Sequence, residues 1–300
     1  MKGDLAQMGA ADRRRMAEAW LDALNAALAR ADWLGAAQVM GDDSYWRDLL
    51  TFGWTFRTSH GIDAIADALA AHYAGSGSRG FRIDGEPQIG HLGAFGETIE
   101  FFIACETRVA TGRGYVRLVL DPGAPDRCKL LAMLTAMKEL KTCPERHRRE
   151  RRGPAPPAPR RGMQNWLDDR EAARSFRDRD PDVVIAGAGM AGLMTAARLQ
   201  QLDIATLIVD RMARVGDVWR KRYRSLTLHN EICTNHFPYL PFPDTWPVYI
   251  PKDKLADWME FYAEAMELNV WTRTTFLGGT YDKDRRWTVR LERADGSIRT

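Results

Sequence analysis

Three glycines and one carboxylate in the second half of the sequence have the types and spacing needed to hold a diphosphate. Gly187, Gly189 and Gly192 form a Gly-x-Gly-x-x-Gly motif in the run GAGMAG, and Asp210 follows 18 residues after Gly192. In a strand–turn–helix unit the first glycine makes the tight turn and the second lets the backbone approach a diphosphate. The third allows the helix to pack closely on the strand. Unpaired N–H groups and a partial positive charge at the start of the helix then hold the anion.

The elements around this motif have the required order. Residues 182–186 form an apolar run typical of a strand, and a helix-forming stretch continues from the motif to Leu202. A second apolar run, 205–209, ends at Asp210, which places a carboxylate where a ribose hydroxyl needs an acceptor. A glycine-rich turn without a ligand is the alternative, and the agreement of strand, helix and acid disfavours it. The run GSGSRG at 75–80 also matches the motif, but it follows a predicted helix and precedes a strand, so we interpret it as a turn.

The motif alone does not separate FAD from NAD, so the residues behind Asp210 matter. In the stretch VGDVWR, residues 215–220, a glycine turn is followed by an aromatic residue and a cation. Trp219 is placed to lie against a flavin or its ribityl chain, and Arg220 to neutralise a phosphate. Core packing for Trp219 and a surface ion pair for Arg220 explain the same residue types equally well.

Two longer stretches carry a resemblance to a known family. GDVWRKRYRSLTLHN, residues 216–230, and LPFPDTWPVYIPKDKLADWMEFYAEAMELNVW, residues 240–271, resemble class B flavin-dependent monooxygenases. Within that class they are most similar to YUCCA-like enzymes and to microbial FAD-dependent monooxygenases that carry a SnoaL-like domain in front. The resemblance covers residues 163–300 closely and the N-terminal half by architecture.

The resemblance assigns no catalytic residue to this chain. The first Rossmann motif of that family holds FAD. The resemblance therefore implies cofactor contacts for the following residues: Gly187, Gly189, Met190, Ala191, Gly192, Asp210, Arg211, Trp219, Arg220, Leu228, His229 and Asn230. Two departures from the family pattern matter. Asp210 stands where Glu is commoner, and Gly216-Asp217 replaces a Gly-Gly pair, which adds a negative charge near the cofactor.

The resemblance also implies a reaction. NADPH or NADH reduces the bound FAD, and molecular oxygen is then used to oxygenate an apolar small molecule, while the protein binds, orients and excludes water. The family's second Gly-x-Gly-x-x-Gly, for the nicotinamide cofactor, has no counterpart except the turn at 75–80. We therefore expect that site beyond Thr300, and we expect the chain to be truncated within its FAD-binding domain.

The segment after residue 236 is predicted to be an extended arm followed by a helix. Four prolines and several aromatic residues in 237–247 favour either a wall over a flavin or apolar substrate, or a structural arm. Apolar residues recur at helical spacing in 252–268, which predicts a helix with one buried face made of core rather than site residues. Asp295-Gly296 predicts a final hairpin with the strand around 287–291.

The N-terminal half, residues 1–140, is predicted to be an α+β domain. Helical spacing around Trp20–Leu28 and Ile62–Tyr73 comes first, and strand-like runs at 99–105, 115–120 and 130–137 follow. This order predicts helices on one face of a curved antiparallel sheet. It resembles the cone shared by ketosteroid isomerases and SnoaL-like cyclases, with residues 44–50 at the mouth of the pocket. In such a cone four residues are candidate general bases, although spacing gives none of them a partner: Asp43, His60, His72 and His91.

A basic, proline-rich stretch, residues 141–161, separates the two halves. It holds eight Lys or Arg against two Glu and contains five prolines, which favours a solvated linker between domains 1–140 and 162–300. The net charge of +3 becomes −3 without its +6. Because the basic residues form one run, we expect no nucleic-acid partner.

The whole chain has the composition of an ordinary globular protein, with 45% hydrophobic and 28% charged residues. We expect a cytoplasmic protein without a membrane span or a bound metal, with reduced structural cysteines, and a homodimer is left open. Two other functions stay open: another FAD-dependent reductase or oxidase, and a small-molecule-binding cone domain with a non-functional flavin segment.

Overall fold

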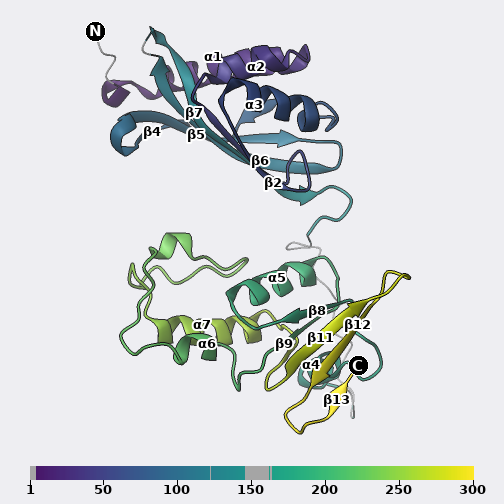
Figure 1. Ribbon diagram of the computed structural model, residues 1–300. Coiled ribbons are helices and arrows are strands. Elements are labelled where there is room, and N and C mark those ends of the chain that lie inside the picture. Colours follow the sequence, from purple (N-terminus) through teal and green to yellow (C-terminus); the bar gives the residue numbers. More distant parts are fainter. Residues whose placement is uncertain (1–4, 122, 146–161, 163) are drawn as a thin grey trace. The chain divides into compact units, whose positions relative to one another are not determined.

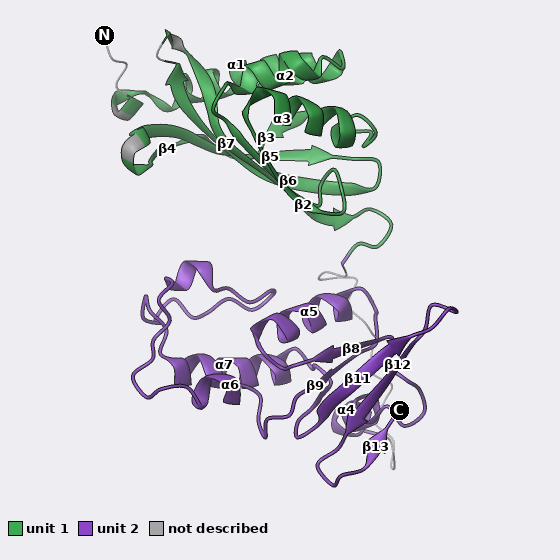
Figure 2. Cartoon of the chain, viewed as in Figure 1, with its two compact units in different colours: residues 1–144 green, residues 145–300 purple. Residues whose placement is uncertain are grey.

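The computed structural model describes residues 5–121, 123–145, 162 and 164–300, and it is a mixed α/β protein. The chain divides into two compact units, Met1–Pro144 and Glu145–Thr300 (Figure 2). The predicted linker, residues 141–161, lies outside the described residues from position 146 onward.

Unit 1 places its helices on one face of a sheet (Figure 1). Its elements are η1 (Leu5–Gln7), α1 (Ala10–Ala29), α2 (Trp33–Met40), β1 (Tyr45–Leu49), β2 (Phe56–His60), α3 (Gly61–Ala68), the π-turn η2 (Leu69–Tyr73), β3 (Phe81–Ile83), β4 (Gln88–His91), η3 (Gly93–Phe95), β5 (Glu97–Glu106), β6 (Ala110–Asp121) and β7 (Ala124–Leu140). Trp20 and Leu24 of α1 are buried, and Trp20 meets Phe101 of β5 edge to face at 6.5 Å. The two helices and three strands predicted from the sequence are confirmed.

The sheet of unit 1 differs from the prediction in one respect. Its strands run in the order β2-β1-β7-β6-β5-β3, with β4 also paired to β5. All these pairs are antiparallel except β1 with β7, which are parallel. We expected an antiparallel sheet, and the structure corrects this expectation at one strand pair. Residues 44–50 mostly form strand β1, whose alternate residues Trp46 and Asp48 are buried. The turn predicted at 75–80 is confirmed between η2 and β3, with Gly77 and Gly80 at positive φ.

Unit 2 is built on a short parallel sheet. Its elements are α4 (Trp166–Ser175), β8 (Val183–Ala186), α5 (Met190–Gln201), β9 (Thr206–Val209), α6 (Asp217–Arg220), η5 (Ile232–Thr234), α7 (Lys252–Ala265), β10 (Val270–Trp271), β11 (Thr275–Tyr281), β12 (Trp287–Glu292) and β13 (Ile298–Arg299). Strands β10, β9 and β8 lie side by side in that order, all parallel, and β8, α5 and β9 form a βαβ unit. Strands β11, β12 and β13 form a separate antiparallel sheet that ends in the predicted hairpin.

Two apolar clusters hold unit 2 together. The larger one joins α5 and α7 to Ile208 of the parallel sheet. The smaller one joins Phe176, Leu207 and Trp271 to Leu291 of β12. Helix α4 ends at Ser175, because Phe176 takes a left-handed conformation there and turns its ring into this smaller cluster.

Candidate cofactor-binding site

The Gly-rich loop lies at the carboxyl end of β8. Strand β8 ends at Ala186 and α5 begins at Met190, so three residues make the turn. Gly187 has φ of 105°, a conformation that side chains disfavour, and its N–H donates to the Val209 carbonyl of β9 at 2.8 Å. The first glycine therefore makes the tight turn that the sequence predicted.

The three glycines differ in the space around them. A Cβ on Gly192 would lie 2.1 Å from the Gly187 carbonyl oxygen, whereas a Cβ on Gly187 or Gly189 would meet nothing within 4 Å. Gly192 is thus required by the packing of α5 on the loop. Gly187 and Gly189 leave an open surface where a ligand can approach the backbone.

The same surface offers hydrogen-bond donors. Gly189 is the N-cap of α5, and no side chain caps this helix within the described residues. The first turn of a helix leaves its N–H groups without intrahelical acceptors, and its dipole favours an anion there. A cradle of open glycines and free amides fits a diphosphate. Met190 is half-buried and Ala191 is exposed in this turn.

Asp210 lies directly beside the loop. Its Oδ2 accepts the Ala188 N–H at 2.7 Å, and its Oδ1 accepts the Met212 N–H at 2.7 Å. The carboxylate thereby ties the end of β9 to the Gly-rich loop and keeps further lone pairs for a hydroxyl donor. Arg211, the next residue, is exposed. Sequence spacing therefore found the acid that the fold brings to the loop.

The predicted contacts behind Asp210 are placed less directly. Trp219 is half-buried against the larger apolar cluster, with the Arg222 guanidinium 5.4 Å from its ring centre. Leu228 is buried, while His229 and Asn230 are exposed. Within the described part of the chain no hydrogen bond joins these residues to the Gly-rich loop. Their roles as cofactor contacts stay predictions.

Arg220 forms ion pairs, which was the alternative to a phosphate contact. One of its nitrogens, Nη2, lies 2.9 Å from Asp257 and 3.0 Å from Glu260, both on α7. The other, Nη1, donates to the Val215 carbonyl at 2.8 Å and lies 3.3 Å from Asp217. Asp217, the departure from the family pattern, is buried and takes part in this network.

Sequence reasoning missed the part that α7 plays here. Lys252 is 5% exposed, and its Nζ donates to the Arg220 carbonyl at 3.0 Å and to Asp253 at 2.6 Å. We had expected the buried face of this helix to be core only. The sequence does contain a signal for it. Lys252 precedes Leu255 by three residues and Ala256 by four, so it lies on the apolar face of the helix, and a buried cation needs a partner there.

The extended arm at 237–247 is part of the core. Phe237 and Phe242 are buried, and they contact Tyr262 and Trp258 of α7 at ring-centre distances of 4.8 and 5.2 Å. Between the two functions that the sequence left open, these contacts favour a structural arm.

In unit 1 two of the four candidate bases form a pair. His60 Nε2 lies 2.6 Å from Asp43 Oδ1, and the His60 ring stacks on Tyr45 at 4.2 Å. Both members of the pair are exposed, as is His91. The pairing joins the turn before β1 to the last residue of β2, which spacing alone does not show.

His72 lines a small cavity instead. Partial burial and the nearby Arg57 guanidinium lower the pKa of His72. The cavity, which Asp48 also lines, has a volume of about 10 Å³. That is room for roughly one water molecule. This cavity is therefore too small to hold a substrate.

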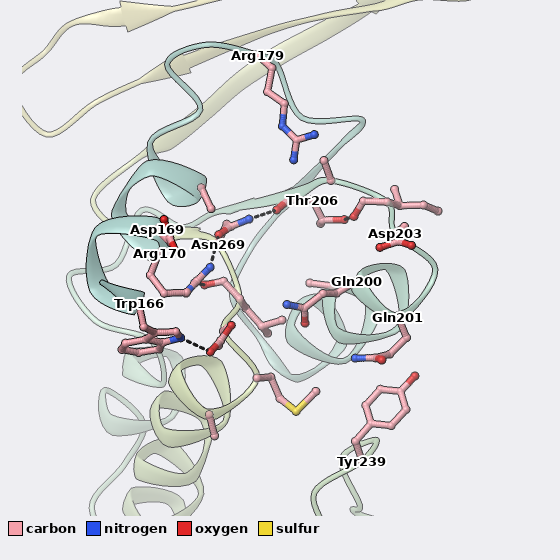
Figure 3. A pocket seen from close by; sticks show the side chains of 18 residues that line it. Trp166, Asp169, Arg170, Arg179, Gln200, Gln201, Asp203, Thr206, Tyr239 and Asn269 are labelled. Atoms are coloured by element: carbon pink, nitrogen blue, oxygen red, sulfur yellow. Dashed lines mark hydrogen bonds between the residues drawn. The ribbon is translucent and has the colours of Figure 1, made fainter. Parts of the chain in front are cut away.

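A cavity of unit 2 lies at the other end of the parallel sheet. It measures about 1340 Å³, and Thr206 at the start of β9 and Asn269 before β10 line it (Figure 3). Arg170 donates to Asn269 across it at 3.1 Å. Ligands of parallel sheets bind at the carboxyl ends of strands, so this cavity is distinct from the Gly-rich loop.

Two features are absent from the described residues. No group of three or more His, Cys, Asp or Glu side chains is arranged to hold a metal. No helix there has the length and apolarity that a membrane span requires.

Comparison with known proteins gives partial matches. No family model matches the chain. It is 38% identical over 96 residues to an uncharacterized CzcO-like oxidoreductase of Geobacillus kaustophilus, covering 32% of this chain and 28% of the relative. It is 32% identical over 128 residues to the indole-3-pyruvate monooxygenase YUCCA1 of Oryza sativa subsp. japonica, covering 42% of this chain and 32% of the relative. Part of this chain is homologous to YUCCA-type monooxygenases.

The homology spans a minor part of each protein. The matched stretches amount to 28% and 32% of the lengths of the two relatives. Among solved structures, a flavin-containing monooxygenase from Stenotrophomonas maltophilia is 23% identical with a TM-score of 0.35, covering 39% of this chain and 35% of that one. A steroid monooxygenase bound to NADP is 24% identical with a TM-score of 0.36, covering 39% and 24%.

Proposed function

We propose that unit 2 binds FAD through residues 187–192 and Asp210, and that the protein is a flavin-dependent monooxygenase. Its substrates would be a small apolar molecule, molecular oxygen, and NADPH or NADH as the reductant. The observation that carries this proposal is the contact of the Asp210 carboxylate with the Gly-rich loop at the carboxyl end of a parallel strand pair. The motif alone fits any dinucleotide, and homology to YUCCA-type monooxygenases favours FAD as the ligand.

The residues of the chain would act by binding and orienting. The first-turn amides of α5 would hold the diphosphate, and Asp210 would accept a hydrogen bond from a ribose hydroxyl. Bound FAD would accept electrons from the nicotinamide cofactor and pass them to oxygen. The aromatic residues of the arm pack on α7 and are part of the larger apolar cluster of unit 2.

A pair of matched substitutions tests the site. In Asp210→Asn one oxygen that accepts a backbone N–H is replaced by a donor, and FAD affinity should fall roughly tenfold or more, the size of a lost charged hydrogen bond. Asp182→Asn is the control, because Asp182 also accepts a backbone N–H, from Ala205 at 2.9 Å, but at the opposite end of the strands. Equal FAD affinity of both variants and the wild type would refute the site.

The reaction class is tested separately. With FAD bound and both NADPH and an apolar substrate supplied, ¹⁸O₂ should leave one labelled oxygen atom in the product and one in water. Stoichiometric release of hydrogen peroxide without a labelled product would favour an oxidase or reductase.

We propose that residues 1–140 form a cone-shaped SnoaL-like domain, which the helices on one face of the unit 1 sheet support, and that residues 141–161 link it to an FAD-binding domain starting at 162. The nicotinamide site, a cytoplasmic location and a homodimer stay predictions.

A further inference from the structure

Arg220 is neutralised before any ligand arrives. Its side chain is 18% exposed, and its guanidinium makes four contacts, two to its own turn and two to carboxylates of α7. Glu260 holds a second cation, because Arg214 Nη2 lies 2.6 Å from it. Three carboxylates therefore surround these two guanidinium groups. A diphosphate placed there would meet those negative charges and would have to break existing ion pairs.

The turn that carries Arg220 is pressed against α7. Gly216 has φ of 90°, and a Cβ on it would lie 2.3 Å from the Ala256 carbonyl oxygen. No other residue type fits this position without moving the turn or the helix. The backbone of residues 215–220 is thus seated on the first half of α7.

Lys252 forms hydrogen bonds with the same segment. Its Nζ donates to the Arg220 carbonyl at 3.0 Å, and its N–H donates to the Leu226 carbonyl at 3.0 Å. Two residues further on, the Leu228 N–H donates to the Ile250 carbonyl at 2.9 Å. The segment between Met212, which contacts Asp210, and Leu228 is therefore attached to α7 at several points.

We propose that Arg220 and Lys252 are positioning residues: they fix the segment 215–230 on α7 beside the Asp210 turn, and Arg220 is not a ligand of the cofactor phosphates. This inference rests on the proposed FAD site. It assigns the cofactor contacts of this segment to its backbone and to Trp219, His229 or Asn230, whose positions depend on the two cations.

The decisive experiment removes the carboxylates instead of the arginine. In the full chain, Asp257→Asn with Glu260→Gln replaces both α7 carboxylates of Arg220 by neutral amides, which removes two ion pairs and leaves weaker acceptors. A positioning Arg220 then loses its hold, and FAD affinity should fall roughly tenfold or more, as when a supporting hydrogen bond of a direct ligand is lost. A phosphate-binding Arg220 would be released towards its ligand, and FAD affinity would be unchanged or higher, which would overturn the proposal.

Two substitutions at Arg220 give an independent answer. A lysine keeps the charge but cannot reach four acceptors, so Arg220→Lys should weaken FAD binding as much as Arg220→Gln. Retained affinity in Arg220→Lys alone would indicate a phosphate contact. The salt dependence of FAD affinity should have the same slope in Arg220→Gln as in the wild type. A shallower slope would also contradict the proposal.

The control and the readouts separate the explanations. Arg214→Gln removes a partner of Glu260 while leaving every contact of Arg220, so its FAD affinity should match the wild type. FAD affinity is measured by flavin fluorescence, and the visible absorption bands of bound flavin should shift in the Arg220 variants because the segment beside the ring moves.

Circular dichroism reports whether each variant is folded. If the double variant unfolds, Glu260→Gln alone replaces it in the experiment. A wild type that binds no FAD would refute the proposed function, whereas variants that bind like a binding wild type would refute only this inference.

Discussion

Alanine at Gly189 and alanine at Gly192 should separate cofactor binding from folding. The Cβ of Gly192→Ala would lie 2.1 Å from the Gly187 carbonyl oxygen and 3.3 Å from Ile185 Cγ2, so the loop must move away from α5. Overpacking of this kind costs about 1–3 kcal/mol, and the better helix propensity of alanine returns up to about 1 kcal/mol. We expect a net loss of about 1–2 kcal/mol. That corresponds to a fall in the Tm of unit 2 of about 2–8 °C.

Gly189→Ala should have the opposite profile. Gly189 has φ of −75° and its Cβ would meet nothing within 4 Å, so the fold accepts it. The cost is that of a poorer N-cap, about 1 kcal/mol or less. However, the methyl group occupies the space that a diphosphate needs, so FAD affinity should fall strongly while the Tm stays near that of the wild type.

The assay is thermal unfolding by circular dichroism together with flavin fluorescence titration. Gly75→Ala is the matched control, because this glycine belongs to the other Gly-x-Gly-x-x-Gly match and its Cβ would also meet nothing within 4 Å. It should change neither quantity. Wild-type FAD affinity in Gly189→Ala, or an unchanged Tm in Gly192→Ala, would show that the loop does not work as described.

Three further predictions concern unit 2 and the cysteines. Gly216→Ala should destabilise unit 2 by about 2–4 kcal/mol in denaturant unfolding, since strain at positive φ adds to overpacking. Burial, with nearby carboxylates, raises the pKa of Cys105 to about 12, so thiol reagents at pH 8 should label the exposed Cys143 and spare Cys105, as mass spectrometry can show. The Arg214 hydrogen bond holds the pKa of Glu260 below its ordinary 4.5. Its stabilisation is therefore present above pH 4.5 and lost below it, and Glu260→Gln should flatten the acid side of the unfolding curve.

The parts of the site that the sequence predicted are those with a local signal. The Gly-rich loop, its strands and Asp210 lie within about 30 residues, and each has a period or a residue type that identifies it. Gly192 needed no structural information, because close packing of helix on strand is what its position in the motif implies.

The parts that the sequence missed depend on distant pairs. Arg220 finds its partners 37 and 40 residues away on α7, and Asp43 meets His60 only because β1 and β2 form a hairpin. The parallel pairing of β1 with β7 joins residues 87 positions apart, such as Tyr45 and Ala132. Residue type and spacing carry no record of such pairs, so an ion pair and a phosphate contact were equally consistent with Arg220.

We propose that the loop at residues 187–192 holds the diphosphate of FAD. Competition tests this most directly: FAD bound to the chain is displaced with ADP or with riboflavin, free flavin is removed, and the FAD that stays on the protein is quantified by chromatography. We predict one FAD for each chain, displacement by ADP, and far weaker displacement by riboflavin, which has no diphosphate. No FAD binding, or displacement by riboflavin as readily as by ADP, would contradict it.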